Sequence, residues 1–158
     1  MDKDRSLREH LVNLLDMKGA HVDFRRTVSD VPFEAQGRTI EGVPASAWEQ
    51  LEHIRIAQWD ILEFSRDPSH QSPKFPVGYW PTSQQPPTPD SWAESVCAFE
   101  SDLEQMKNLV RDPNQDLFEP FPWGNGQTLL REALLVADHN AYHLGQIVQL
   151  LRALGYWE

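Results

Sequence analysis

The feature that most constrains the fold is a strict apolar rhythm in residues 92–110. Large apolar side chains recur there at alternating intervals of four and three residues: Trp92, Val96, Phe99, Leu103, Met106 and Val110. This spacing is that of one face of an α-helix, whereas a strand would alternate at every second residue. Pro89 suits the first turn of such a helix and Pro113 ends it, because proline lacks the N–H that a helix interior needs. The segment therefore predicts a long amphipathic helix.

Three further segments carry helical patterns. Residues 4–30 have apolar side chains at helical spacing, and residues 46–66 begin with a capping box at Ser46. Residues 128–154 begin at Thr128, a favourable N-cap, and are followed by a glycine that favours helix termination. No internal repeat and no strand pattern is visible. We therefore predict an all-α four-helix bundle that forms a single domain over the 158 residues.

A long segment of irregular composition separates the second and third predicted helices. Residues 67–89 contain seven of the 12 prolines, together with the aromatic residues Tyr79 and Trp80. A loop of this length in a compact domain usually has a covering or functional role. We expect it to cross one end of the bundle near the proposed site, with Tyr79 or Trp80 lining a cavity and His21 as a second wall. The competing interpretation is that the loop packs on the outer face and only caps the core.

The net charge limits the classes of partner. It is −10, from 24 acidic and 14 basic side chains, and no basic stripe is visible. This argues against binding to nucleic acids and to anionic membrane surfaces. No apolar run approaches the roughly 20 residues of a membrane span. A single cysteine, Cys97, allows no internal disulfide framework and fits a reducing compartment, so we expect a soluble cytoplasmic protein.

The last predicted helix carries a pair of histidines away from its apolar stripe. Its expected core positions are Leu130, Leu134, Ala137, Ala141, Leu144, Val148 and Leu151. His139 and His143 are four residues apart on another face, so they can hold one metal ion together. His53, in the middle of the second helix, is the best candidate for a third ligand. Three neutral imidazoles suit zinc best, with nickel or ferrous iron as alternatives, although three hydrogen-bonded helix histidines would give the same pattern.

Other site types fit the sequence poorly. A di-iron centre of the ferritin type needs Glu-x-x-His on two helices. Gln50 and Val136 stand where those glutamates would be, three residues before His53 and His139. There is also no nucleophile elbow, no phosphate-binding glycine loop and no C-x-x-C pair. We expect Cys97 to pack in its helix as a small apolar residue.

Several short motifs together indicate a family. They are Trp48, Glu52-His53, Gln58-Trp59-Asp60, Tyr79-Trp80-Pro81, Leu130-Arg131-Glu132 and Asp138-His139-Asn140-Ala141-Tyr142-His143. In these motifs the chain resembles the DinB-like superfamily of four-helix bundles, which includes metal-dependent hydrolases and thiol-dependent transferases. The resemblance covers nearly the whole chain and implies a divalent metal on His53, His139 and His143. It also implies frequent homodimers, but no single reaction.

Two functions are compatible with these observations. The first is a metal-dependent enzyme, either a hydrolase or a low-molecular-weight thiol transferase, that acts on a small molecule. Asp60 and Glu132 lie two turns from a histidine on the same helix face, so they could move protons or, more simply, orient a ligand. The second function is a non-catalytic stress-response or scaffold bundle, in which the metal only stabilises the fold. A cavity that reaches the metal would favour the enzyme.

Overall fold

The computed structural model describes residues 2–158, and these residues form helices without strands. The α-helices are α1 (Lys3–Leu15), α2 (Phe24–Val28), α3 (Phe33–Gln36), α4 (Ala47–Arg66), α5 (Ser91–Arg111) and α6 (Leu129–Ala153), and the 3-10 helix is η1 (Val77–Tyr79). Within the described range the only β-type pairings are two isolated bridges, Ile40–Val43 and Pro120–Thr128. The all-α class predicted from the sequence is confirmed.

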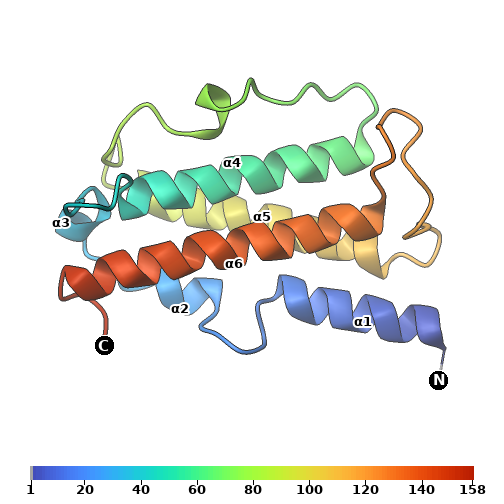
Figure 1. Cartoon of the computed structure of the whole chain (residues 1–158), viewed down its shortest axis with the longest axis horizontal. Coiled ribbons are helices and arrows are strands. Elements are labelled where there is room, and N and C mark those ends of the chain that lie inside the picture. Colours follow the sequence, from blue (N-terminus) through green and yellow to red (C-terminus); the bar gives the residue numbers. More distant parts are fainter. Residues whose placement is uncertain (1) are drawn as a thin grey trace.

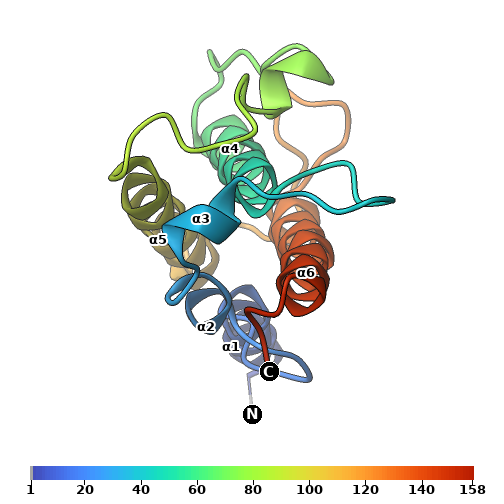
Figure 2. The same ribbon diagram turned by 90° about the vertical axis from the view of Figure 1, so that its left-hand side faces the viewer.

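The four longest helices pack side by side around a common core. Helix α4 contacts both α5 and α6, and α1 contacts the same two helices from the other side. The end-on view in Figure 2 shows α4 and α1 at opposite corners, with α5 and α6 between them. The short helices α2 and α3 pack against α6 and α4, respectively. Because α4 and α6 are in direct contact, side chains near the middle of one can meet those of the other.

The first predicted helix is broken, which corrects the prediction of one helix over residues 4–30. Helix α1 ends at Leu15, and Met17 adopts a left-handed backbone with φ 55°. Asp23 then starts α2, because its side chain accepts a hydrogen bond from the backbone N–H of Arg26. The side chain of Met17 is buried, at 4 % exposure. Apolar contact therefore holds a backbone conformation that a continuous helix would not allow, and the helical spacing continued across the break by coincidence.

Helices α4 and α6 begin at the predicted caps, whereas α5 begins at Ser91, so Pro89 precedes its first turn instead of lying in it. At α4, the Ser46 side chain accepts from the Glu49 backbone N–H, and the Glu49 carboxylate accepts from the Ser46 N–H. At α6, the Thr128 side chain accepts from the Arg131 N–H. These bonds satisfy backbone donors that have no partner inside the helix. Gly155, with φ 80°, follows the C-terminus of α6 in the left-handed conformation that glycine tolerates best.

The core is built from the facing sides of the long helices. Its largest fully buried side chains are Phe99, Leu15, Leu51, Ile54, Leu62, Met106, Leu117, Leu129, Leu144, Ile147, Leu150 and Leu151. Two predicted core positions are wrong, because Leu134 is 44 % exposed and Cys97 is also exposed. The buried stripe of α6 instead includes Ala133, Val136 and Ile147. None of the helices in residues 2–158 combines the length and apolar character that a bilayer crossing requires.

The connection from α4 to α5 runs back along α4. In Figure 1 this segment leaves the C-terminal end of α4 and follows its outer side to the start of α5. Its short helix η1 contacts α4. Ser46, the N-cap of α4, holds the later part of the segment by donating its hydroxyl to the Gln84 carbonyl, at 2.7 Å. The segment thus lies along the side of α4 rather than across one end of the helices, and it passes the middle of α4, where His53 lies.

Candidate metal centre

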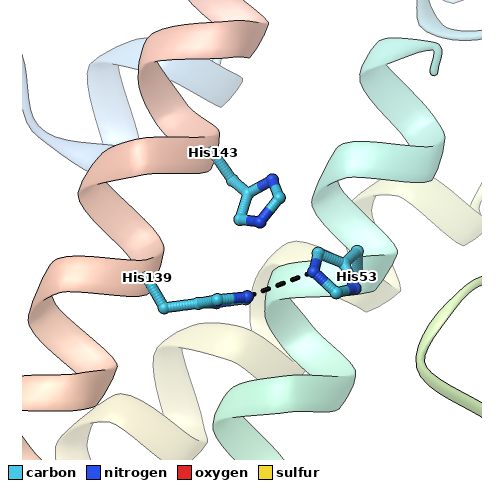
Figure 3. Close-up of side chains that lie close together, drawn as sticks. All are labelled: His53, His139 and His143. Carbon is cyan, nitrogen blue, oxygen red and sulfur yellow. Dashed lines mark hydrogen bonds between the residues drawn. The ribbon is translucent and has the colours of Figure 1, made fainter. Parts of the chain in front are cut away.

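Three histidines from two helices meet between α4 and α6. His53 comes from the middle of α4, and His139 and His143 project from one face of α6 toward it (Figure 3). One ring nitrogen of each histidine lies within 4.8 Å of the others. The Nε2 atoms of His53 and His139 are 3.1 Å apart. The four-residue spacing on α6 and the contact between α4 and α6 together produce this convergence.

In His53 and His143, the ring nitrogen that points away from the cluster, Nδ1, lies within hydrogen-bond distance of an acceptor. The Nδ1 of His53 lies 2.8 Å from the backbone carbonyl of Tyr79. The Nδ1 of His143 lies 2.6 Å from Oε1 of Gln50, whose amide nitrogen donates to Gln146 at 2.9 Å. Because a carbonyl oxygen can only accept, each Nδ1 carries the proton in its neutral ring. Both Nε2 atoms are therefore left with a lone pair, which is the ligating form of imidazole.

Burial keeps the three imidazoles neutral. It lowers the pKa of His143 to about 3, and the neighbouring charges of His139 and His53 act in the same direction. The pKa of His139 falls to about 4, first through burial and then through His53, with Asp138 opposing. Burial also lowers the pKa of His53, against the hydrogen bond to Tyr79. Neutral histidines at neutral pH are ready to bind a metal without first losing a proton.

The donor set fits a single divalent ion. Two imidazoles that share one zinc ion at roughly 2.0–2.1 Å have their nitrogens no more than about 4.2 Å apart. The 3.1 Å between His53 and His139 lies inside that limit, and the 4.8 Å bound on the set requires only a small ring rotation. In the metal-free protein, Nε2–H of His139 can donate to the lone pair on Nε2 of His53, and a bound cation would take the place of that proton. The chemistry of the three donors therefore suits a metal.

Comparison with known proteins agrees with this arrangement. A model of the DinB superfamily matches residues 16–147, a span that contains all three histidines. The chain belongs to the DinB superfamily. Separate searches of curated proteins and of solved structures gave no match.

Aromatic rings flank the histidines of this DinB protein. Trp80 lies parallel to the His53 ring, with ring centres 4.0 Å apart and an interplanar angle of 4°. Tyr142 meets the His143 ring edge-on at 4.9 Å. Trp80 is half-buried and Tyr142 is exposed. Trp80 of the predicted pair therefore lies beside His53, but neither Trp80 nor the three histidines line any of the five cavities described in residues 2–158.

The side chain of Tyr79 points elsewhere. Its hydroxyl donates to Oδ2 of Asp60 at 2.6 Å, while its backbone carbonyl accepts from His53. Burial, followed by the hydrogen bond to the Asp60 carboxylate, raises the pKa of Tyr79 to about 12. The hydroxyl therefore stays protonated and remains a donor. Tyr79 contributes its backbone, and not its ring, to the neighbourhood of the histidines.

The two candidate carboxylates lie away from the histidines. Seven helical residues separate Asp60 from His53, and seven separate Glu132 from His139, which is roughly 10 Å in each case. Glu132 is 2 % exposed and accepts from Arg131 at 2.7 Å. Burial raises the pKa of Glu132, and Arg131 opposes this shift. Both carboxylates line a separate cavity of about 220 Å³ together with Arg131. Neither is in position to bind the same ion as the histidines.

The structure does not bring His21 to this site. It lies in the irregular segment between α1 and α2, is exposed, and has its Nδ1 2.8 Å from the Val22 carbonyl. It lines a different cavity, with Gly145 and Trp157 among the other lining residues. The expectation that His21 forms a second wall rested on a continuous first helix. Because that helix ends at Leu15, His21 has no helix face to place it toward the core.

Sequence reasoning missed three residues that support the site. Gln50 and Gln146 lie three residues from His53 and His143 on the same helices, so their helical spacing was a usable signal. From the sequence, Gln50 indicates only that a glutamate of a di-iron centre is absent. His70, whose Nε2 is 2.7 Å from Oδ1 of Asp60, lies in the loop, where no periodic pattern marks it.

Proposed function

We propose that this DinB protein is an enzyme that binds a divalent metal ion on His53, His139 and His143 and uses the ion in catalysis. The expected ion is zinc, with nickel or ferrous iron as alternatives, since imidazole serves all three. The reaction class is hydrolysis, or transfer involving a low-molecular-weight thiol, on a small-molecule substrate. The observation that carries this proposal is the meeting of three imidazoles, of which His53 and His143 have their Nδ1 atoms held by Tyr79 and Gln50, respectively.

The protein side of the chemistry follows from the same contacts. His53, His139 and His143 would hold the divalent ion, which would leave room for a water or a thiol, lower the pKa of that group and polarise an electrophile. The hydrogen bonds to Tyr79 and Gln50 orient two of the rings and fix their protonation. Trp80 and Tyr142 provide the apolar contacts that small-molecule sites commonly use. The net charge of −10 disfavours a nucleic-acid substrate.

The architecture proposed for this function is the DinB-type four-helix bundle. Helices α1, α4, α5 and α6 are its four members, and residues 67–90 are its crossover loop. We propose that the chain is one domain, since the buried residues of these helices form a shared core. We also propose a cytoplasmic homodimer, with Trp157 either at a helix end, where it packs against the core of its own chain, or at a subunit contact. Sedimentation at micromolar concentration tests the assembly, and a monomer there would refute it.

The primary experiment is metal stoichiometry. Protein purified without a metal-affinity tag should contain about one divalent ion per chain, measured by inductively coupled plasma mass spectrometry. His53→Ala, His139→Ala and His143→Ala should each lose it. His10→Ala is the matched control, because His10 is an exposed helix histidine outside the cluster. Metal retained in all three site variants would refute the centre.

Turnover separates an enzyme from a structural metal. The loaded protein should be assayed with panels of esters and amides, and with small electrophiles in the presence of cysteine or glutathione. Turnover that disappears in His143→Ala supports the enzyme. An alternative outcome is no turnover in any panel, together with a large loss of thermal stability when a chelator removes the metal. That result would replace the proposed enzyme by a bundle with a structural metal.

A further inference from the structure

Tyr79 connects two residues of α4 that lie two helical turns apart. Its hydroxyl donates to Oδ2 of Asp60 at 2.6 Å, and its backbone carbonyl accepts from Nδ1 of His53 at 2.8 Å. We propose that Asp60 is a positioning residue for the metal centre, acting on His53 through Tyr79. This inference rests on the proposed function, because its consequence is the affinity of the three histidines for a metal. It gives Asp60 a role that requires no contact with metal or substrate.

Asp60 binds the loop between α4 and α5 through two hydrogen bonds. Both of its carboxylate oxygens are used by loop residues: Oδ1 lies 2.7 Å from Nε2 of His70, and Oδ2 accepts from Tyr79. Asp60 is 8 % exposed, and the side chain of His70 is 9 % exposed. One buried carboxylate therefore fastens two loop positions that are nine residues apart. Trp59 adds an edge-on contact to the His70 ring at 5.2 Å.

The hydrogen-bonded group of Asp60, His70 and Tyr79, called the clamp below, determines which hydrogen-bond acceptor and which aromatic ring contact His53. The acceptor for Nδ1 of His53 is a backbone atom of the loop, so its position depends on how the loop is held. The next residue, Trp80, stacks on the same ring at 4.0 Å. Release of Tyr79 would therefore remove both the hydrogen bond and the ring contact. His53 could then carry its proton on Nε2, where it would face the other histidines and block ligation.

Only the loop provides this support for His53. His143 is oriented by Gln50, which belongs to α4 itself and needs no loop. The arrangement therefore makes a specific distinction between the two ligands. Loss of the clamp should alter His53 while leaving the protonated nitrogen of His143 unchanged. A general loosening of the helices would alter both.

The test uses the conservative variant Tyr79→Phe, which deletes only the hydroxyl. Zinc affinity should be measured by competition with a chromophoric chelator, and the protonated nitrogen of each histidine by long-range ¹H–¹⁵N NMR of the metal-free protein. We expect the zinc dissociation constant to rise about 10–100-fold, the range typical for loss of an outer hydrogen-bond partner. The His53 tautomer should become mixed, while that of His143 stays as in the wild type. Tyr156→Phe is the control, since Tyr156 is an exposed tyrosine beyond the end of α6 and outside the histidine cluster, and it should leave both readouts unchanged.

A double-mutant cycle tests whether Asp60 acts through Tyr79. Asp60→Ala should weaken zinc binding about as much as Tyr79→Phe, and the double variant should be no weaker than Asp60→Ala alone. Additive effects would overturn the proposal, as would wild-type zinc affinity and an unchanged His53 tautomer in Tyr79→Phe. Circular dichroism verifies that each variant is folded, and if Asp60→Ala unfolds, Tyr79→Phe alone decides. If the wild type binds no metal, the proposed function fails, and the His53 tautomer still decides whether the clamp exists.

Discussion

Trp80 and His53 are stacked face to face, with ring centres 4.0 Å apart and planes 4° from parallel. The two residues are 27 positions apart in the chain and belong to a loop and a helix. The stack restricts rotation of the His53 ring about its last torsion, while the Tyr79 carbonyl holds its Nδ1. It also covers one face of the ring against water. The loop between α4 and α5 is therefore part of the site.

Trp80→Leu tests whether this tryptophan serves a bound molecule. We expect zinc to be retained, because all three histidines remain. The affinity for benzohydroxamate, an aromatic metal-binding probe, should fall by about 2–13-fold, corresponding to the roughly 0.5–1.5 kcal/mol of an aromatic contact. Trp123→Leu is a control at the far end of α4, where Trp123 donates to the Phe64 carbonyl. If Trp80→Leu loses both zinc and probe binding and has a lower melting temperature, Trp80 stabilises the fold instead of contacting a bound molecule.

Gln50 should support metal binding through His143. Gln50→Leu removes the acceptor of the His143 Nδ1–H and should weaken zinc binding by about 10–100-fold. Gln50→Glu keeps an acceptor and should restore most of the affinity. Gln149→Leu, an exposed glutamine on α6, is the matched control. Wild-type affinity in Gln50→Leu, measured by chelator competition, would exclude this role.

The metal-free protein should lose stability as the pH falls below about 6.5. Burial lowers the folded pKa of His139 to about 4 and that of His143 to about 3. Between these values and the unfolded pKa, the unfolded chain binds more protons than the folded protein, so the free energy of unfolding decreases as pH decreases. Above the unfolded pKa both states are neutral and the histidines contribute no pH dependence.

Urea denaturation at several pH values, with a chelator present, measures this effect. The variant carrying both His139→Gln and His143→Gln should show a shallower decline between about pH 6.5 and pH 4, because two of the responsible groups are gone. His10→Gln, which changes an exposed histidine, should follow the wild-type curve. Parallel curves for the wild type and the double variant would show that these histidines titrate normally.

Arg8, on α1 and away from the histidines, should contribute strongly to the stability of the fold. It is 8 % exposed, and its guanidinium donates to three backbone carbonyls at the end of α5 and just beyond, those of Val110, Asp112 and Gln115. Arg8→Met leaves these acceptors without their partner, so we expect a loss of about 2–4 kcal/mol in urea denaturation. Arg5→Met is the control: Arg5 makes an exposed pair with Glu9, and its loss should cost less than about 1 kcal/mol. Equal effects of the two variants would contradict this assignment.

The sequence alone determined the features that depend on neighbours along the chain. Helix starts at Ser46 and Thr128 were predictable because a cap bonds to a backbone N–H three residues later. The pairing of His139 with His143 was predictable because residues four apart share a helix face. His53 was reached by combining its central position in a helix with the family resemblance. These inferences use local hydrogen bonding and helical periodicity, both of which the chain carries explicitly.

Only the tertiary structure decided the features that depend on distant groups. The break after Leu15 depends on the burial of Met17, and the helical spacing of apolar residues does not predict this break. The partner of His53 is a backbone carbonyl, and a carbonyl is present at every residue, so the sequence cannot distinguish that of Tyr79. Asp60 forms a hydrogen bond with His70 because the loop returns along α4. Such contacts follow from how the loop packs, and packing is settled by the whole set of side chains rather than by spacing along the chain.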